Sequence, residues 1–573
     1  MTTKLKVYAN EDDALLFWSI PAPISECRGF AIQRKKNGVE EFLPNRVGFA
    51  NDHDHGPADE DAKGVLKPST ELPFQRFSWT DHDANTGDTV SYRVVPIVRK
   101  GKKLEPLEAH ASDWSDDKTL GHSAGPFKAF FNRGFVMSQF VARFLAENKL
   151  TLAKFKDRIR DENDTTIRTF LSGDLRLALL DQLKKAKDEK GEVFAVLFEL
   201  GDDELIAALA ALGKKAHVVL ANGSVQKKKG ETSAEARRRD ENEEARQTLK
   251  DAGIDVEPKN RFLSPGALGH NKFLVRTDKK GKPVALWTGS TNWASTGLCT
   301  QVNNGLLAED PGVAQIYLDQ WDRLRKAKSI FPNPLVASNS SPKQSGDDVP
   351  GRIRSTVWFT RASKGVDLEA LAAEVNKARE GILFLMFMPG AAGLFSTVAA
   401  RSAEPNLYVR GVVSELPNGR GDESAVDVNL IDGANHTPLH LDIIQPEGAD
   451  NHSMADFVVE VTHKQFTAGV GHAIVHSKVV VIDPFSPDPV VITGSHNFSS
   501  AASSKNDENF IIIKGDRHLA EAYAVNIMGA YAHYRWRAFL SKTKKPFNGL
   551  RDDDTWQTPK LANEQRELRF WGV

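Results

Sequence analysis

The feature of this sequence that most limits its fold is a motif that occurs twice. In each copy a single residue separates a His from a Lys, and an apolar run follows. A second apolar run comes next and ends in a Gly-Ser-x-Asn turn. The first copy contains His270, Lys272, Gly289, Ser290 and Asn292, and the second copy contains His476, Lys478, Gly494, Ser495 and Asn497. Two collinear copies with similar spacing predict two related units that build one site at a pseudo-two-fold interface.

The residue types in this motif suit phosphoryl chemistry. Side chains alternate along a strand, so His-x-Lys places both side chains on one face. Two Lys, two Asn and two Ser that converge form a positive pocket suited to one phosphate. Two His supply a nucleophile and a proton donor. The motif has neither a carboxylate cage nor Cys ligands, so we expect no metal and no cofactor.

The motif resembles that of the phospholipase D superfamily, His-x-Lys-x4-Asp followed by Gly-Ser-x-Asn. The second copy matches it in full through Asp483, and Glu508 resembles the family's trailing acid in Asn-x-Glu. The first copy departs from the pattern twice. Its acid, Asp278, comes one residue late, with Thr277 at the expected position, and Asn303 stands where the second copy has Glu508.

The resemblance implies a two-step reaction through a phosphohistidine, in which one His attacks phosphorus and the other protonates the leaving oxygen. By analogy with two-lobed family members, we expect His270 to be the nucleophile and His476 the acid. Glu508 would bond the far nitrogen of a catalytic His. The residues expected to hold the phosphoryl group or support the site are Lys272, Lys478, Asn292, Asn497, Ser290, Ser495, Asp278 and Asp483.

Three hypotheses for the function remain open. Hydrolysis of phospholipid head groups is preferred, since two motifs in one chain and a net charge of −1 favour it over nucleic-acid binding. The alternative is a nuclease acting on DNA or RNA, because residues 492–498 and 506–509 look like the small bacterial nucleases of the superfamily. The third is an inactive binding protein, and transfer to an alcohol instead of water also remains open.

Residues 1–118 read as an all-β sandwich that resembles fibronectin type III or immunoglobulin-like domains, with Trp18 and Tyr92 in its core. Its partner is unknown. An Asp-His cluster at 52–55 is expected to be a solvated loop. Histidines 463, 472 and 496 are expected to rim the cleft or cap loops.

The rest of the chain alternates helices with short apolar strands, which predicts an α/β fold. We expect two pseudo-symmetric phospholipase D-like α-β-α lobes, at 125–336 and 351–573, joined by a linker at 337–350. The basic residues between 227 and 239 are expected in a solvated loop, although they could line a phosphate-bearing groove. The expected strands are 193–198, 217–220, 382–388 and 407–413, and the expected helices are 135–148, 175–187, 204–212, 368–379, 394–400 and 519–540.

The uncharged stretch 382–400 is interrupted by Pro389, Gly390 and Gly393, which predicts a buried strand, a loop and a helix start rather than a membrane span. We therefore expect no integral membrane segment. Two distant cysteines fit a reducing compartment, and the N-terminus lacks the apolar core of a signal peptide. These features predict a cytoplasmic protein, leave export by a signal-independent route open, and are consistent with a monomer.

Overall fold

A computed structural model describes residues 2–45, 47–49, 66–134, 152–390, 392–414, 441–444, 475–542 and 549–573. The helix expected at 135–148, the Asp-His cluster at 52–55, His463 and His472 lie outside the described residues.

The N-terminal part of the chain forms a sandwich of two antiparallel sheets. The first sheet contains β1 (Lys4–Ala9), β2 (Ala14–Ser19) and β7 (Ser78–Asp81). The second contains β3 (Cys27–Lys36), β4 (Val39–Phe42), β8 (Thr89–Lys100), β9 (Lys103–Pro106) and β10 (Lys118–Thr119), and a separate pair joins β5 (Pro44–Asn45) to β6 (Lys67–Pro68). Trp18 and Phe30 meet edge to face between the sheets with centroids 5.7 Å apart, and Tyr92 is also fully buried, as expected.

A six-stranded sheet follows the sandwich. Its order is β11 (Phe127–Phe131), β16 (Asn304–Ala308), β15 (Pro283–Gly289), β14 (Lys272–Thr277), β12 (Val193–Leu197) and β13 (Ala216–Leu220). The helices of this region are α2 (Leu152–Arg160), α3 (Ile167–Asp188), α4 (Asp203–Ala210), α5 (Ser233–Ala236), α6 (Glu243–Asp251), α7 (Ser295–Cys299), α8 (Pro311–Ala327) and α9 (Asn333–Asn339). The basic residues 227–229 lie in an exposed loop before α5.

An eight-stranded sheet occupies the rest of the chain. Its order is β17 (Lys343–Ser345), β18 (Arg354–Phe359), β24 (Asn509–Lys514), β23 (Val490–Gly494), β22 (Val479–Ile482), β19 (Gly381–Met386), β20 (Tyr408–Val413) and β21 (Leu441–Ile444). Its helices are α10 (Val366–Val375), α11 (Leu394–Ser402), α13 (Ser500–Ser504), α14 (Arg517–Lys542) and α15 (Gln557–Phe570). Strand β17 falls within the expected linker and pairs with β18.

The two large sheets share one topology over six strands. The order β11-β16-β15-β14-β12-β13 corresponds to β18-β24-β23-β22-β19-β20. In both sheets every pair in this order is antiparallel except the last, which is parallel. The duplicated motif therefore lies on equivalent strands, β14 and β15 in one sheet and β22 and β23 in the other.

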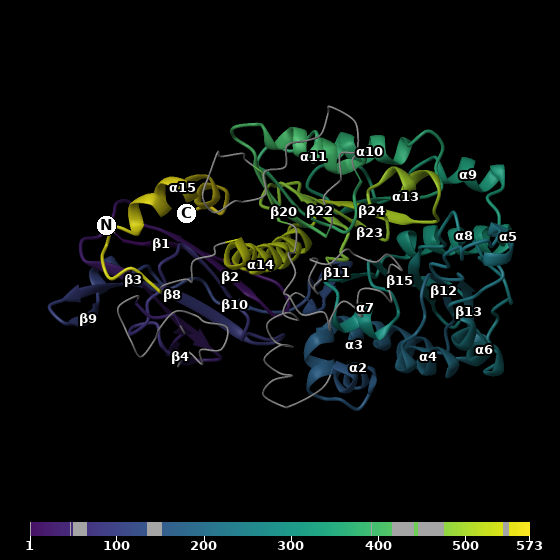
Figure 1. Ribbon diagram of the computed structural model, residues 1–573, viewed down its shortest axis with the longest axis horizontal. Helices are drawn as coiled ribbons and strands as arrows, with labels where there is room; N and C mark the ends of the chain where they lie inside the picture. Colours follow the sequence, from purple (N-terminus) through teal and green to yellow (C-terminus); the bar gives the residue numbers. More distant parts are fainter. Residues whose placement is uncertain are drawn as a thin grey trace.

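Each of these strands is buried on both faces, which explains its nearly continuous apolar sequence. Along β12, Val196 faces a core shared with α8, α14 and the eight-stranded sheet, whereas Leu197 faces α3, α4 and α6. Besides these two hydrophobic clusters, a third packs α10 and α11 against the other face of the eight-stranded sheet. Figure 1 shows these outer helices above and below the two sheets, with the sandwich at the left.

The stretch 382–400 forms a buried strand, β19, followed by a loop and α11, as the sequence predicts. Within the described ranges, none of the helices combines the length with the apolar composition that crossing a bilayer requires. The helix expected at 519–540 is α14, and its Tyr531 and Tyr534 are buried in the shared core, so they do not cover the motif residues.

Candidate active site

Short β-bridges between the two large sheets bring the motif copies together. Gly269, directly before the first motif, pairs in parallel with Asp507 of the second half. The backbone N–H of His270 donates to the carbonyl of Asp507 at 2.9 Å, and Asp507 N–H donates to Leu268 at 2.8 Å. This pairing places His270 beside the residue that follows Asp507, which is Glu508.

The second motif makes the mirrored bridge. Val475 pairs in parallel with Val302 of the first half. The backbone N–H groups of His476 and Ser477 donate to the Val302 carbonyl at 2.9 and 2.8 Å. His476 therefore lies beside Asn303. The strands themselves begin at Lys272 and Val479, so each His precedes its strand and is fixed by the bridge instead of by the strand.

His270 has a carboxylate behind it. Its Nδ1 lies 2.7 Å from Glu508 Oε2, and Asn506 Nδ2 donates to Glu508 Oε1 at 3.0 Å. Burial opposes ionisation of Glu508, but its hydrogen bond with His270 and the charge of Lys272 lower the pKa of this carboxyl overall. An ionised carboxylate only accepts, so Nδ1 of His270 carries the hydrogen and Nε2 keeps a free lone pair.

His476 has a neutral amide behind it. Its Nδ1 lies 2.9 Å from Asn303 Oδ1, which also accepts from Ser290 Oγ at 2.7 Å. Asn303 Nδ2 donates to the carbonyl of Gly297 at 2.9 Å, which sets the orientation of the amide. Each histidine thus takes its partner from the other half of the chain.

Burial favours the neutral form of both imidazoles. Burial and the charge of Lys272 lower the pKa of His270 to about 4, against the opposing charge of Glu508. Burial and the charges of Lys478 and Lys272 lower the pKa of His476 well below its usual value. A bound anion would favour the protonated form of either group.

The two motif lysines are fully enclosed. Lys272 is 2% exposed and donates to the carbonyl of His270 at 2.8 Å, and Lys478 is 0% exposed and donates to the carbonyl of His476. Burial lowers the pKa of Lys272 to about 7, opposed by Glu508 and Glu199. The pKa of Lys478 is also lowered by burial and by Lys272.

Two phenylalanines that the motif does not contain complete this arrangement. The rings of Phe198 and His270 meet edge to face at 4.7 Å, and those of Phe387 and His476 at 4.9 Å. Each Phe ring also lies under the lysine of its own copy, at 4.9 and 4.8 Å. The only sequence signal for them is their place directly after the apolar strands β12 and β19.

The motif serines stabilise the Gly-Ser turns through buried hydrogen bonds. Ser290 Oγ accepts from the backbone N–H of Asn304 at 3.0 Å, and Ser495 Oγ accepts from that of Asn509 at 3.0 Å. Both hydroxyls are buried, so the serines tie the Gly-Ser turn to the strand after it.

The motif asparagines face the site. Asn292 Nδ2 donates to Glu199 Oε2 at 2.6 Å, a carboxylate that was not expected from the sequence. The Oδ1 atoms of Asn292 and Asn497 are buried without a hydrogen-bond partner in the described part of the chain. A buried polar atom of this kind is costly unless it meets a ligand or solvent.

The supporting acids lie away from the histidines. Asp483 follows β22 at the end opposite His476, and its carboxylate accepts from three successive backbone N–H groups at the start of β19. These donors are Arg379, Glu380 and Gly381, at 2.7 to 3.1 Å. Asp483 therefore anchors a strand and does not contact the reacting groups.

In the first copy, Thr277 takes this place. Its hydroxyl accepts from the backbone N–H of Glu192, just before β12, at 3.0 Å. Asp278 lies in the exposed hairpin turn, where it accepts from the N–H groups of Lys280 and Lys282 at 2.8 and 2.9 Å. The structure does not bring Asp278 to the site.

His496, expected to rim the cleft or cap a loop, is fully buried within its own turn. Its Nδ1 accepts from the backbone N–H of Phe498 at 2.9 Å, and its Nε2 lies 3.2 Å from Asp367. Through Asp367, His496 links this turn to α10.

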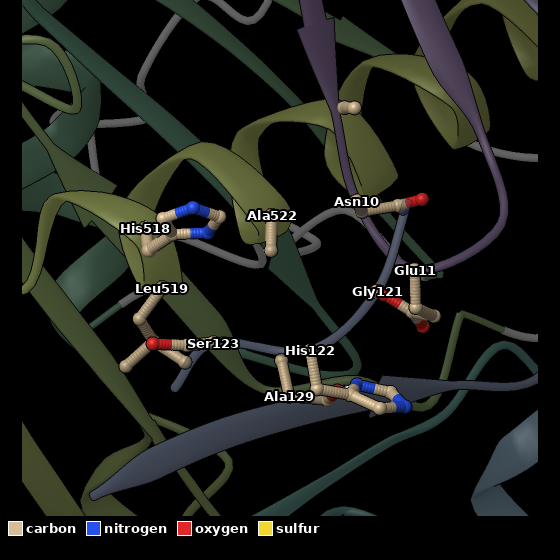
Figure 2. A pocket seen from close by; sticks show the side chains of 10 residues that line it. Asn10, Glu11, Gly121, His122, Ser123, Ala129, His518, Leu519 and Ala522 are labelled. Atoms are coloured by element: carbon tan, nitrogen blue, oxygen red, sulfur yellow. Dashed lines mark hydrogen bonds between the residues drawn. The ribbon is translucent and has the colours of Figure 1, made fainter. Parts of the chain in front are cut away.

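No group of three or more His, Cys, Asp or Glu in the described ranges is arranged to hold a metal ion. Figure 2 shows a separate cavity of about 10 Å³ between the β1–β2 turn, β11 and α14, lined by residues that include Glu11, His122 and His518. It is too small for a phosphodiester and contains none of the motif residues.

Comparison with known proteins supports a relation to the phospholipase D superfamily. Residues 420–528 match a family model described as "Cardiolipin synthase, PLD-like domain". The chain is 53% identical over 53 residues to phospholipase D of Rickettsia felis and 51% identical over 53 residues to that of Rickettsia conorii. These segments are 9% of this chain and 24% of each relative, so the chain spans about a quarter of the curated relatives it matches.

Solved structures show weaker likeness. Phosphatidylserine synthase of Haemophilus influenzae Rd KW20 aligns with a TM-score of 0.39 and 11% identity, over 70% of this chain and 94% of that one. Nuc of Salmonella typhimurium, a phospholipase D family member, aligns with a TM-score of 0.21 and 18% identity, over 32% and 96%. The match to a phospholipase D-like domain therefore rests on residues 420–528, within a mixed α/β fold.

Proposed function

We propose that this protein hydrolyses phosphodiesters through a phosphohistidine, and that its substrates are phospholipids. The observation that carries this proposal is the crossed pairing of His270 with Glu508 and His476 with Asn303, with two buried lysines beside them. We further propose that residues 125–336 and 351–573 are pseudo-symmetric lobes of one enzyme, which the common strand order supports.

The reaction begins with His270 as the nucleophile. Its Nε2 attacks phosphorus and forms a P–N bond while the bond to the leaving oxygen breaks. Glu508 stabilises the positive charge that then develops on the imidazole. Lys272 and Lys478 hold the charge of the phosphoryl oxygens in a site without bulk water.

His476 is the proton carrier. Protonated beside the bound anion, it gives its Nε2 proton to the leaving alcohol, and in the second step it takes a proton from the attacking water. The P–N bond then breaks and His270 is restored. Its neutral partner Asn303 leaves the imidazolium more acidic than a carboxylate would, which suits proton donation.

Phospholipid is the preferred substrate because the sequence relatives carry the name phospholipase D. The test is a side-by-side assay with phosphatidylcholine vesicles, single-stranded DNA and double-stranded DNA, all in the presence of EDTA. We expect head-group release that persists with EDTA, because the lysines supply the positive charge. Cleavage of DNA without head-group release would replace the phospholipid proposal with the nuclease alternative.

Each histidine should be essential. We expect His270→Ala and His476→Ala each to lower turnover by about 1000-fold or more, since residues that act as a unit fail together. Asp278→Ala, in the exposed turn, is the matched control and should retain turnover. Full activity in either histidine variant would falsify the shared site.

A further inference from the structure

The residue that follows the phenylalanine beside each motif histidine differs between the two halves of the chain. Phe198 is followed by Glu199 in the first half, whereas Phe387 is followed by Met388 in the second. The positions are equivalent because each Phe ring contacts the His of its own motif copy at nearly the same distance. Glu199 and Met388 are both partly exposed.

Glu199 is held in place from two directions. Its backbone carbonyl accepts from Trp293 N–H at 3.2 Å, and its Oε2 accepts from Asn292 Nδ2 at 2.6 Å. Its charge also opposes the effect of burial on the pKa of both Lys272 and Lys478. The carboxylate is therefore close to the groups that would hold the phosphoryl oxygens.

Resting on the function proposed above, we propose that Glu199 orients an unsymmetrical phosphodiester by accepting a hydrogen bond from a hydroxyl or amino group of one alcohol. A carboxylate and a phosphoryl oxygen are both negative acceptors, so Glu199 does not itself bind the phosphate. A donor on the adjacent alcohol offsets the charge of Glu199. In the second half, Met388 follows Phe387 and has a flexible apolar side chain suited to an aliphatic alcohol.

The test compares three 4-nitrophenyl phosphodiesters whose second ester is ethyl, 2-hydroxyethyl or 2-aminoethyl, after subtraction of the uncatalysed rate. For the wild-type protein we expect kcat/KM for the two donor-bearing esters to exceed that for the ethyl ester by about 10-fold or more. A larger gain for the aminoethyl ester assigns the site to amino alcohols, and an equal gain assigns it to polyols.

Three variants separate the contribution of the Glu199 charge from that of its hydrogen-bond acceptor. Glu199→Met gives both halves the same residue and should bring the three kcat/KM values together. Glu199→Gln keeps an acceptor oxygen without the charge, so it should retain the preference for hydroxyethyl over ethyl and lose any additional gain for aminoethyl. Met388→Leu is the matched control in the other half and should keep the wild-type ratios.

Equal kcat/KM values in the wild type, or a preference that survives in Glu199→Met, would overturn the role of Glu199. Hydrolysis of the ethyl ester that depends on His270 would leave the phosphodiesterase proposal standing in that case. Absence of turnover with all three esters would contradict the phosphodiesterase proposal and the Glu199 assignment together.

Discussion

The two histidines of the site differ in the charge of the group behind Nδ1. Glu508 behind His270 is a carboxylate, whereas Asn303 behind His476 is an amide that also accepts from Ser290. A carboxylate stabilises a positive imidazole, which under the proposed mechanism matters most for the histidine that carries the phosphoryl group. This asymmetry therefore predicts different roles for His270 and His476, which occupy the same position in the two motif copies.

We expect Glu508→Gln to lower kcat by about 100-fold or more, because the variant retains an acceptor for His270 Nδ1 but loses its charge. Steady-state kinetics on the best substrate would measure the effect. Asn303→Gln keeps a neutral amide in the other half and serves as the comparison. A Glu508→Gln protein with the wild-type kcat would contradict this assignment.

The lowered pKa of Lys272 predicts a basic limit to activity. Its folded-state pKa of about 7 lies below the usual lysine value, so the ammonium is present below pH 7 and is lost as the pH rises through 7. Phosphate binding then weakens, and kcat/KM, which reports the free enzyme, should fall above about pH 7.

The variant Lys272→Arg tests whether loss of the Lys272 charge causes this fall in kcat/KM, since a guanidinium stays charged over the same pH range. We expect a lower maximum, because the geometry differs, together with a decline that begins at higher pH. A profile of kcat/KM between pH 5 and 10 for both proteins is sufficient. An identical basic limb in the two profiles would assign the decline to another group.

At this scale the sequence predicted the motif residues and the correspondence of Asn303 with Glu508, because these depend on residue type and spacing. It did not predict Phe198, Phe387 or Glu199, because an aromatic or acidic residue after an apolar strand has no distinctive pattern. Their role depends on contacts that only the paired sheets create.

Among the elements, the strands were the most predictable. Strands β12, β19 and β20 lie within one or two residues of the expected ranges, because strands buried on both faces are short, nearly continuous apolar runs. The inter-sheet bridges at Gly269 and Val475 were not predictable, since they join segments far apart in sequence. Helix α15 was missed because its sequence is largely polar with weak periodicity.

Asp483 links two elements, and its removal should cost stability more than activity. We expect Asp483→Ala to lower the free energy of unfolding by about 1–3 kcal/mol, because three backbone N–H groups lose their acceptor. Its φ of 48° is a further strain for Ala. Urea denaturation measures the loss.

The comparison for this prediction is Asp278→Ala, whose exposed turn should change stability by no more than about 0.5 kcal/mol. The kcat of folded Asp483→Ala should stay near the wild-type value, since the carboxylate lies beyond β22 from His476. Loss of kcat at unchanged stability would instead give Asp483 a part in the chemistry.

Over the whole molecule, the sandwich and the two large sheets share one continuous core. Residues of β2, β8, α14 and both large sheets belong to the same buried cluster. The C-terminal residues close this arrangement, because Trp571 is fully buried and stacks on Phe17 of β2 with centroids 4.6 Å apart. Trp556 Nε1 also donates to the carbonyl of Cys27 at 3.0 Å.

We expect Trp571→Ala to lower the free energy of unfolding by about 3–5 kcal/mol, the usual cost of emptying a buried aromatic site. The sandwich and the large sheets should still unfold in one transition. Leu177→Ala, at a half-exposed position on α3, is the control and should have a small effect. A variant whose sandwich melts separately would show that the shared core does not couple these parts.

The exchange of partners between the halves also has a consequence for biosynthesis. His270 leaves the ribosome long before Glu508, and His476 emerges only after Asn303 has already been made. During translation the first motif is therefore present without Glu508 and without His476 and Lys478 of the second motif. If the crossed pairing is required for turnover, a nascent or truncated chain is inert, and catalytic competence arises only when synthesis has passed residue 508 and the two halves have docked.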